Sequence, residues 1–259
     1  MLSHIKKSTY VVGIVIIVLF VILYHFLKPQ ECNVAVVNLT GEMFTTIDPT
    51  DTTDQQVTSD QVDQQLETAN NNPHIKAIIL SIDSPGGQPT AGEDIMKELK
   101  SINKPTVALA RSEDNSAAYL ASLGADTIFA ADTSSVGDIG ITSSYTDNSV
   151  QDQQNGITFN QLSVGKYKDM FNIDKPLTDD ERTLEMDHVQ KLYNIFVQLV
   201  ADNRHMSFAT AENLANGSEY LGNDALNNGL IDHVGNMQDV EQYLKEKVGK
   251  KVRICDYKN

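Results

Sequence analysis

Apolar runs of strand length that alternate with amphipathic helical patterns constrain the fold more than any other feature of this sequence. The run Ile75–Ile82 is nearly continuous, which is typical of a strand buried on both faces of a parallel sheet. A capping-box spacing from Thr90 to Glu93 predicts that a helix follows, and Lys104–Ala110 again reads as a strand. This alternation predicts an α/β fold with a largely parallel sheet and right-handed crossovers.

The same alternation continues on both sides of these segments. A first strand is expected at Val34–Leu39, and a helix that begins with a capping box at Thr58 and Gln61 follows it. A short helix is expected from Ser116 to Gly124, then a strand at Asp126–Ala131. Thr178 and Glu181 predict the start of a long helix that has its apolar face at Val189, Leu192, Phe196 and Val200.

The N-terminus carries an apolar run, Tyr10–Leu27, that is just long enough to span a bilayer core of about 30 Å. It lacks a small-residue cleavage site, so we interpret it as a retained signal anchor that inserts the chain into the cell membrane. Lys6 and Lys7 precede the run and few cations follow it, which favours a cytoplasmic segment 1–9 and an extracytoplasmic remainder. Residues 28–57 are expected to form a linker that contains the first strand.

Charge and composition exclude some functions. The formal net charge of -15 argues against nucleic acid binding, which needs clustered cations. Two cysteines and six scattered histidines form no metal-ligand spacing, so no metal or other cofactor is expected. Cys32 and Cys255 lie near the two ends of the exported part, where they either pair in an oxidising compartment or remain separate.

Ligands of open α/β sheets bind beyond the carboxyl ends of the strands, so the loops after Ile82 and Ala110 are the candidate site. The stretch Asp83–Gly87 offers glycine N–H groups for an oxyanion hole, although Pro-Gly-Gly is also an ordinary turn. Ser116 stands at an expected helix start, where it is either a nucleophile or only an N-cap.

A serine nucleophile needs a base, and no histidine lies between His74 and His188. Lysine can serve if burial lowers its pKa from about 10.4 toward neutrality. The stretch Ser163–Phe171 offers Lys166 and Lys168. The alternative for either residue is a solvated surface lysine.

The order of five motifs resembles the short form of signal peptide peptidase A, within the ClpP/crotonase superfamily. The motifs are "ILSIDSPGG", "SAAYLAS", "GDIG", "GKYKDM" and "LANGSEYLGNDALNNGLIDHVG", and the resemblance covers Val34–Leu244. It implies a ClpP/crotonase-like fold of repeated β-β-α units in a protease domain that spans residues 58–259 with the strand 34–39. It also implies a membrane-anchored serine endopeptidase that degrades remnant signal peptides and other small hydrophobic segments.

The resemblance assigns roles to individual residues. Ser116 matches the nucleophile and Lys168 the general base of a Ser/Lys dyad, which leaves Lys166 as the less favoured base. Gly87 and the N–H of Ala117 match the oxyanion hole. Members of the family assemble as ring-like homo-oligomers, so the dyad forms within one subunit or between neighbours.

Two positions depart from the family pattern. Ala117 and Ala118 follow the serine where the family has two glycines, which narrows the site. Asp138 replaces a serine that hydrogen-bonds the lysine, and a carboxylate there would raise the pKa of the lysine. These departures leave a catalytically impaired membrane scaffold or adaptor as an alternative. A crotonase-like acyl-thioester enzyme is another, because a fold alone does not fix the chemistry.

Overall fold

The computed structural model describes residues 32–46, 56–249 and 251–257. The expected cytoplasmic segment 1–9 and the expected anchor Tyr10–Leu27 lie outside these ranges. None of the helices within them combines the length and the hydropathy needed to cross a bilayer. Residues Asn33–Asn259 form one compact unit, which is the part of the chain described below.

A mostly parallel sheet forms the centre of this unit. Its main path runs β10–β1–β4–β5–β6–β9, in which every neighbouring pair is parallel. A short branch adds β7, parallel to β5, and β8, antiparallel to β7. The strands are β1 (Val34–Thr40), β4 (Ala77–Ser84), β5 (Thr106–Asn115), β6 (Thr127–Ala130), β7 (Ser135–Gly137), β8 (Glu219–Leu221), β9 (His233–Val234) and β10 (Ile254–Asp256). The predicted α/β class and parallel sheet are therefore confirmed.

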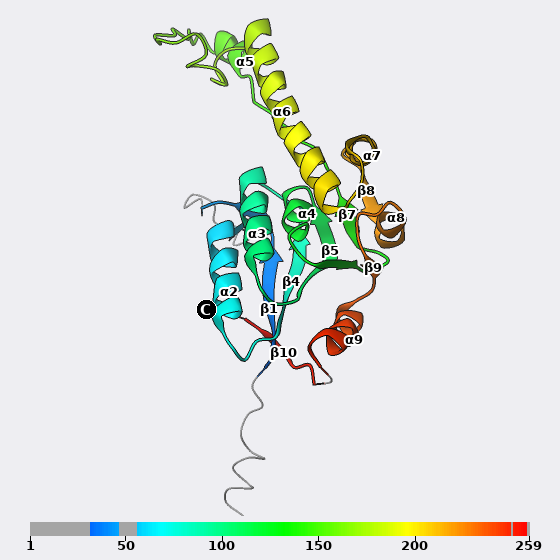
Figure 1. Cartoon of the computed structure of the whole chain (residues 1–259). Coiled ribbons are helices and arrows are strands. Elements are labelled where there is room, and N and C mark those ends of the chain that lie inside the picture. The colour runs from blue at the N-terminus through cyan, green and yellow to red at the C-terminus, as the bar shows by residue number, and fades with distance from the viewer. Residues whose placement is uncertain (1–31, 47–55, 250, 258–259) are drawn as a thin grey trace, which may run out of the picture. The chain divides into compact units, whose positions relative to one another are not determined.

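Helices cover both faces of the sheet, which explains the continuous apolar strand sequences. Three helices lie together on one face in Figure 1: α2 (Ser59–Asn71), α3 (Pro89–Ser101) and α4 (Ala117–Ser122). On the other face, Val240 and Leu244 of α9 (Met237–Val248) pack on alternate strand residues. Those strand residues are Val34, Val36, Ala77, Ile79, Val107, Leu109 and Phe129.

Two predicted capping boxes form and one does not. Thr58 with Gln61 caps α2, and Thr178 with Glu181 caps α6 (Asp179–Asn203). The predicted start at Thr90 is wrong, because α3 already begins at Pro89 and its N-cap, Gln88, makes no side-chain capping bond. Proline has a fixed φ that suits the first turn of a helix, so it sets the start here.

Two short parallel strands pair with each other, β2 (Glu42–Phe44) and β3 (Gln56–Thr58). β2 lies within the expected linker, residues 28–57, and β3 lies at its end. Both cysteines of the chain, Cys32 and Cys255, are disulfide-bonded. Of the two alternatives left open by the sequence, the structure therefore has the paired one.

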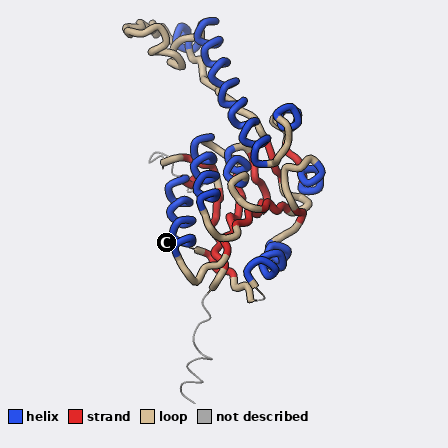
Figure 2. Tube along the Cα trace, viewed as in Figure 1, coloured by secondary structure: helices blue, strands red, loops and turns tan. Residues whose placement is uncertain are grey.

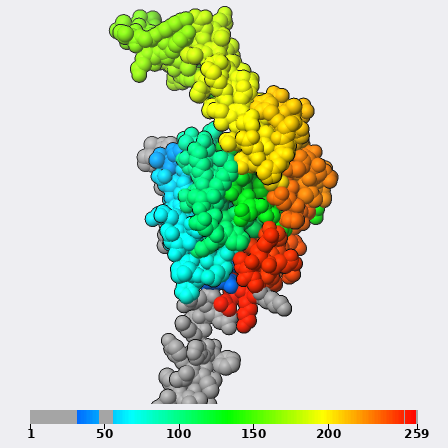
Figure 3. Space-filling model, viewed as in Figure 1, coloured from blue at the N-terminus to red at the C-terminus, as the bar shows by residue number. Residues whose placement is uncertain are grey.

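An arm projects from the body of this unit, as Figure 3 shows for the green and yellow atoms of α5 (Ser149–Gln154) and the N-terminal part of α6. It consists of helix and loop, with the strands confined to the body (Figure 2). The C-terminal half of α6 is anchored in the body by Phe196, Val197, Val200 and Ala201, which are all buried. The remaining helices, α7 (Phe208–Leu214) and α8 (Gly222–Asn227), lie beside β8.

Candidate active site

Ser116 occupies a sharp turn between β5 and α4. Its backbone has φ +52° and ψ -120°, a region that residues other than glycine seldom adopt. The Ser116 N–H donates to the Gly137 carbonyl oxygen (2.7 Å), which fixes the turn against β7. Its side chain makes no capping hydrogen bond to α4. Ser116 is thus the N-cap residue of α4 by position, but its hydroxyl does not cap the helix.

The glycine pair after β4 packs against this turn. Gly86 and Gly87 have φ of +104° and +148°, and a Cβ on Gly87 would lie 2.2 Å from the Met43 carbonyl oxygen. A Cβ on Gly86 would lie 2.9 Å from the Ala117 nitrogen, so the loop contacts the first turn of α4 directly. Only glycine fits both the backbone angles and this close approach.

Ser84 organises the same loop. The buried Ser84 hydroxyl donates to the Gly41 carbonyl oxygen (2.6 Å) and accepts from the Gly86 N–H (3.1 Å). In the described part of the chain the Gly87 N–H donates to no acceptor, and the Ala117 N–H is an unsatisfied donor of a first helical turn. The loop and the helical turn that meet at Ser116 therefore each carry a backbone N–H without an acceptor, and N–H groups of this kind form oxyanion holes.

A cleft of about 570 Å³ contains most of these groups. Gly87, Ser116 and Asp138 all line it, so the structure brings three of the predicted site residues together. Its other lining residues, which the sequence analysis did not assign to the site, are Pro85, Gly140, Ile141, Thr142, Tyr193, Ala215, Asn216 and Gly217. The segments 140–142 and 215–217 meet because the Gly217 N–H donates to the Ile139 carbonyl oxygen (3.2 Å). No local sequence pattern predicts this long-range contact.

Asp138 lines the cleft, and none of the described residues places a cation beside it. Its φ is +46° and its N–H donates to the Ser218 carbonyl oxygen (3.0 Å), which holds the residue in place. Partial burial raises the pKa of the Asp138 carboxyl, and the neighbouring Glu219 raises it further. Glu219 itself accepts a hydrogen bond from the Ser135 hydroxyl (2.8 Å). A single chain therefore offers Asp138 a negative neighbour rather than a lysine.

Lys168 is not in the cleft of its own chain. It is an exposed residue of the arm, where its backbone N–H donates to the Gly165 carbonyl oxygen (3.1 Å). The nearby Lys166 pairs with Asp180 in the first turn of α6, at 2.6 Å. Asp180 and the cleft residue Tyr193 are about 20 Å apart along α6, at about 1.5 Å per residue. The lysines thus lie at the far end of the helix from Ser116.

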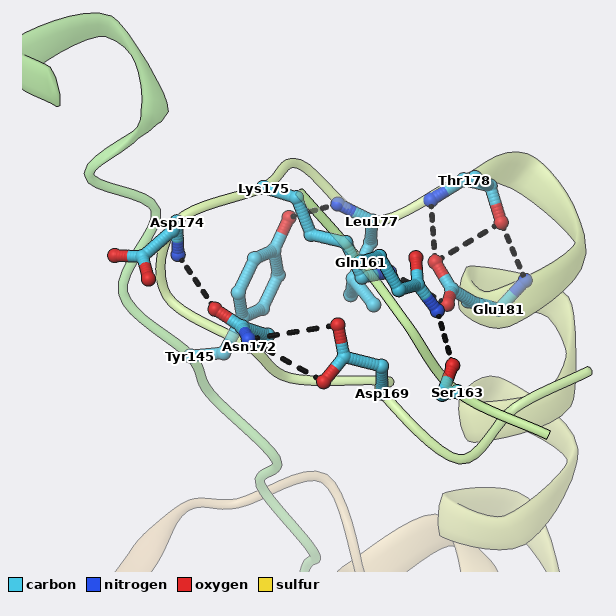
Figure 4. A network of polar contacts seen from close by, with 10 residues as sticks. All are labelled: Tyr145, Gln161, Ser163, Asp169, Asn172, Asp174, Lys175, Leu177, Thr178 and Glu181. Carbon is cyan, nitrogen blue, oxygen red and sulfur yellow. Dashed lines mark hydrogen bonds and ion pairs between the residues drawn. The ribbon is translucent and has the colours of Figure 1, made fainter. Parts of the chain in front are cut away.

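A polar network fixes the lysine-bearing segment to the start of α6 (Figure 4). Lys175 pairs with the buried Glu181 at 2.7 Å, and this pairing holds the pKa of Glu181 below its usual range. Glu181 also accepts the Thr178 N–H (2.9 Å), while the Asn172 side chain donates to the Asp169 carboxylate (3.3 Å). The segment that carries Lys168 is therefore held to the start of α6 by side-chain contacts.

The two lysines differ in their partners. The ion pair with Asp180 raises the pKa of Lys166, so this amine is held in its charged form. The Lys168 amine makes no ion pair within the described residues. Of the two candidates, Lys168 is the one that is free to act elsewhere.

Comparisons with known proteins agree with this arrangement. The family model of Clp protease matches residues 38–135, and that of Peptidase family S49 matches residues 98–252. A protein of Enterococcus faecium named "Putative signal peptide peptidase SppA" is 31% identical over 199 residues, which are 75% of this chain and 58% of that protein. The chain thus spans less than two thirds of the length of this relative.

Two solved structures share the fold. One is a serine-to-alanine mutant of the 1510-N membrane-bound stomatin-specific protease, with a TM-score of 0.57, 16% identity, and coverage of 89% of this chain and 96% of that one. The other is a point mutant of ClpP1 from Listeria monocytogenes, with a TM-score of 0.54, 14% identity, and coverage of 79% and 92%. The fold and the serine turn define the class, a ClpP-like α/β protein. Within that class, the chain belongs to Peptidase family S49, which confirms the resemblance seen in the sequence.

Proposed function

We propose that this protein is a membrane-anchored serine endopeptidase with Ser116 as nucleophile and Lys168 as general base. The observation that carries the proposal is the Ser116 turn: Ser116 lines a cleft together with Gly87, and its side chain makes no capping bond to the helix that follows. Family membership supports the same reaction class. The anchor at Tyr10–Leu27 and an extracytoplasmic body are part of this proposal.

The proposed mechanism has two stages. The neutral amine of Lys168 takes the proton of the Ser116 hydroxyl as its oxygen attacks the peptide carbonyl carbon, and the Gly87 and Ala117 N–H groups stabilise the oxyanion. The intermediate then expels the amine product, which receives the proton from the lysine. Water attacks the acyl-enzyme and gives a proton to the lysine. Collapse of the second intermediate releases the acid product and returns the proton to Ser116.

Lys168 is proposed to reach the Ser116 of a neighbouring subunit in a ring-like assembly. The arm that carries Lys168 exposes large apolar side chains: Leu162 and Val164 are 97% and 98% exposed. Exposed apolar groups of this kind often mark a surface that binds another protein. Docking against a second subunit would bury the arm and remove water from the amine. Burial lowers the pKa of a lysine, which is what a base at neutral pH needs.

The proposed substrates are remnant signal peptides and other small hydrophobic segments. This proposal depends on the name of the Enterococcus faecium relative and on the expected position at the membrane. The lining of the cleft is mainly polar, with Pro85, Ile141 and Ala215 among its apolar residues, so the cleft itself does not carry this part of the proposal. A membrane scaffold without catalysis is the second candidate, which Asp138 and the Ala117-Ala118 pair favour.

We predict that Lys168→Ala and Lys166→Ala behave differently. In the full-length chain in mild detergent, cleavage of a fluorogenic peptide should fall by at least about 100-fold in Lys168→Ala, because the reaction loses its base. Lys166→Ala is the matched control, and it should retain activity because its amine is engaged with Asp180. Equal behaviour of the two variants would contradict the assignment of Lys168.

Mixing experiments test whether the dyad forms between subunits. Ser116→Ala and Lys168→Ala should each be inactive, and co-assembly should restore part of the activity because some pairs contain both intact residues. No restoration in verified mixed assemblies would contradict the intersubunit dyad. If the wild-type chain cleaves no peptide at all, the result would instead favour the scaffold without catalysis.

We predict that Asp138→Ser shifts the acid limb of the pH–rate profile to lower pH by about one unit or more. A carboxylate near the amine favours the ammonium form, so its removal should lower the pKa of the base. Glu113→Gln is the control, because Glu113 does not line the cleft. An unchanged limb in Asp138→Ser would mean that the carboxylate does not contact the lysine in the active assembly.

A further inference from the structure

A buried carboxyl group that the proposed mechanism does not use lies on the strand that leads into the Ser116 turn. Asp114 is two residues before Ser116, at the end of β5, and is 0% exposed. Neither of its carboxyl oxygens has a hydrogen-bond partner among the described residues. A buried polar group without a partner costs free energy, and such groups in native structures call for an explanation, of which a catalytic role is one.

The surroundings of Asp114 supply no compensating charge. It pairs with Ser84 of β4 and Val136 of β7, and the Ser84 hydroxyl is already bonded to Gly41 and Gly86. On α4, the Ser122 hydroxyl lies near but donates to the Tyr119 carbonyl oxygen (2.9 Å).

The titratable group closest to Asp114 on α4 is Tyr119. It is buried, and its hydroxyl donates to the Leu230 carbonyl oxygen (2.8 Å). Tyr119 also experiences the charges of Arg204 and Asp232, which pair with each other at 2.8 Å. No lysine or arginine therefore neutralises Asp114 in the described part of the chain.

Burial consequently favours the uncharged form of Asp114. It raises the pKa of this carboxyl to about 7. Below about pH 7 the residue is a neutral acid. At higher pH, a buried negative charge would stand on β5 two residues before Ser116, beside the Ser84 that holds the Gly86-Gly87 loop.

We propose that Asp114 is a positioning residue that must stay uncharged for Ser116 to react, and that its ionisation sets the alkaline limit of activity. This inference builds on the proposed peptidase function. A charge at Asp114 would oppose the oxyanion held by the Gly87 and Ala117 N–H groups, since like charges repel strongly where water is excluded. It would also favour the ammonium form of a lysine at the site.

The two ionisations act in opposite directions on the rate. Loss of the lysine proton increases activity as pH rises, whereas loss of the Asp114 proton decreases it. The product is a bell-shaped profile whose alkaline limb belongs to Asp114. Replacing this carboxyl by an uncharged group should remove that limb and leave the acid limb in place.

The test is the pH dependence of kcat/KM between about pH 6 and 10 for the full-length wild type and Asp114→Asn. The ratio of activity at about pH 9 to that at about pH 7 should be at least about tenfold larger in Asp114→Asn, because one required protonation is gone. Asp63→Asn is the matched control: burial raises the pKa of Asp63 to about 7 too, with help from Glu98, but Asp63 lies on α2. Its profile should follow the wild type.

If the wild type is active and Asp114→Asn has the same pH dependence of kcat/KM, the inference is overturned and the peptidase proposal stays intact. A wild type no more active than Ser116→Ala would instead reject the peptidase proposal itself. If Asp114→Asn does not fold, Asp114→Leu gives the same comparison.

A third measurement needs no change at Asp114. In an Asp63→Asn background, the infrared band of a protonated carboxyl should persist at about pH 6 and disappear in step with activity above about pH 7. If the band of the protonated carboxyl is absent at about pH 6, the inference is overturned as well.

Discussion

Replacement of Ser116 by alanine is expected to lower kcat/KM by about 10⁴- to 10⁶-fold, the range for loss of a serine nucleophile. In the proposed mechanism the Ser116 oxygen forms the bond to the substrate, so its loss would leave only the residual catalysis that backbone donors support. The variant should fold normally, because the Ser116 side chain makes no capping bond. The measurement is steady-state cleavage of a fluorogenic peptide by the full-length chain in mild detergent.

Ser112→Ala is the matched control for this prediction. Ser112 is an exposed residue of the same strand, and its loss should leave the rate within about twofold of the wild type because surface substitutions usually have small effects. Activity of Ser116→Ala near that of Ser112→Ala would contradict a serine mechanism.

The second large effect concerns stability. Asp114 has a pKa of about 7 in the folded chain against 3.8 ordinarily, so the unfolded chain gives up this proton at lower pH. Folding stability is therefore unaffected by this group below about pH 4, falls as pH rises toward about 7, and is lower by about 4 kcal/mol above it. Asp114→Asn should recover about this amount at about pH 8.

Melting temperatures at fixed protein concentration measure the recovery. The gain for Asp114→Asn should be roughly 10 °C at about pH 8 and close to zero at about pH 4. Asp63→Asn should give a smaller gain, because Asp63 is only half-buried and water screens its charge. A gain for Asp114→Asn that does not change with pH would show that the carboxyl is not the cause.

The strands β1, β4, β5 and β6 could be predicted because the physics that sets them is local, although β5 continues to Asn115, past the expected end at Ala110. The short strands β7, β8, β9 and β10 were not expected from the sequence. A strand covered on both faces has no polar side, so Ile75–Ile82 marks β4 within a few residues. The start of α3 was predicted too late in the chain because a capping-box spacing at Thr90 was preferred to the proline before it. The pairing of β2 with β3 involves three residues on each side, which is too short for a periodic signal.

The part of the site that could be predicted is the part formed by loops at the carboxyl ends of the parallel strands. Parallel strands end at one edge, so the loops that carry Gly87 and Ser116 were expected to meet, and they do. The segment after β7 adds Asp138 to the same cleft. The place of Lys168 is set by α6 and the polar network at its start, which a sequence pattern does not locate in space.

Asp114 was not singled out in the sequence, because an acidic residue in a loop or at a strand end is usually exposed. Only the packing of β4, β7 and α4 around it shows that it is buried. A charged residue just before a candidate nucleophile could have been a signal, since such positions tune reactive groups.

The central claim is that a base delivered by the arm activates the Ser116 hydroxyl. Covalent labelling by a fluorophosphonate, with the modified residue located by mass spectrometry, tests it most directly. The account predicts that the wild-type chain is labelled at Ser116 and that Lys168→Ala is labelled at least about 100-fold more slowly, with Lys166→Ala unchanged. Label on another residue, or an equal rate in Lys168→Ala, would contradict it.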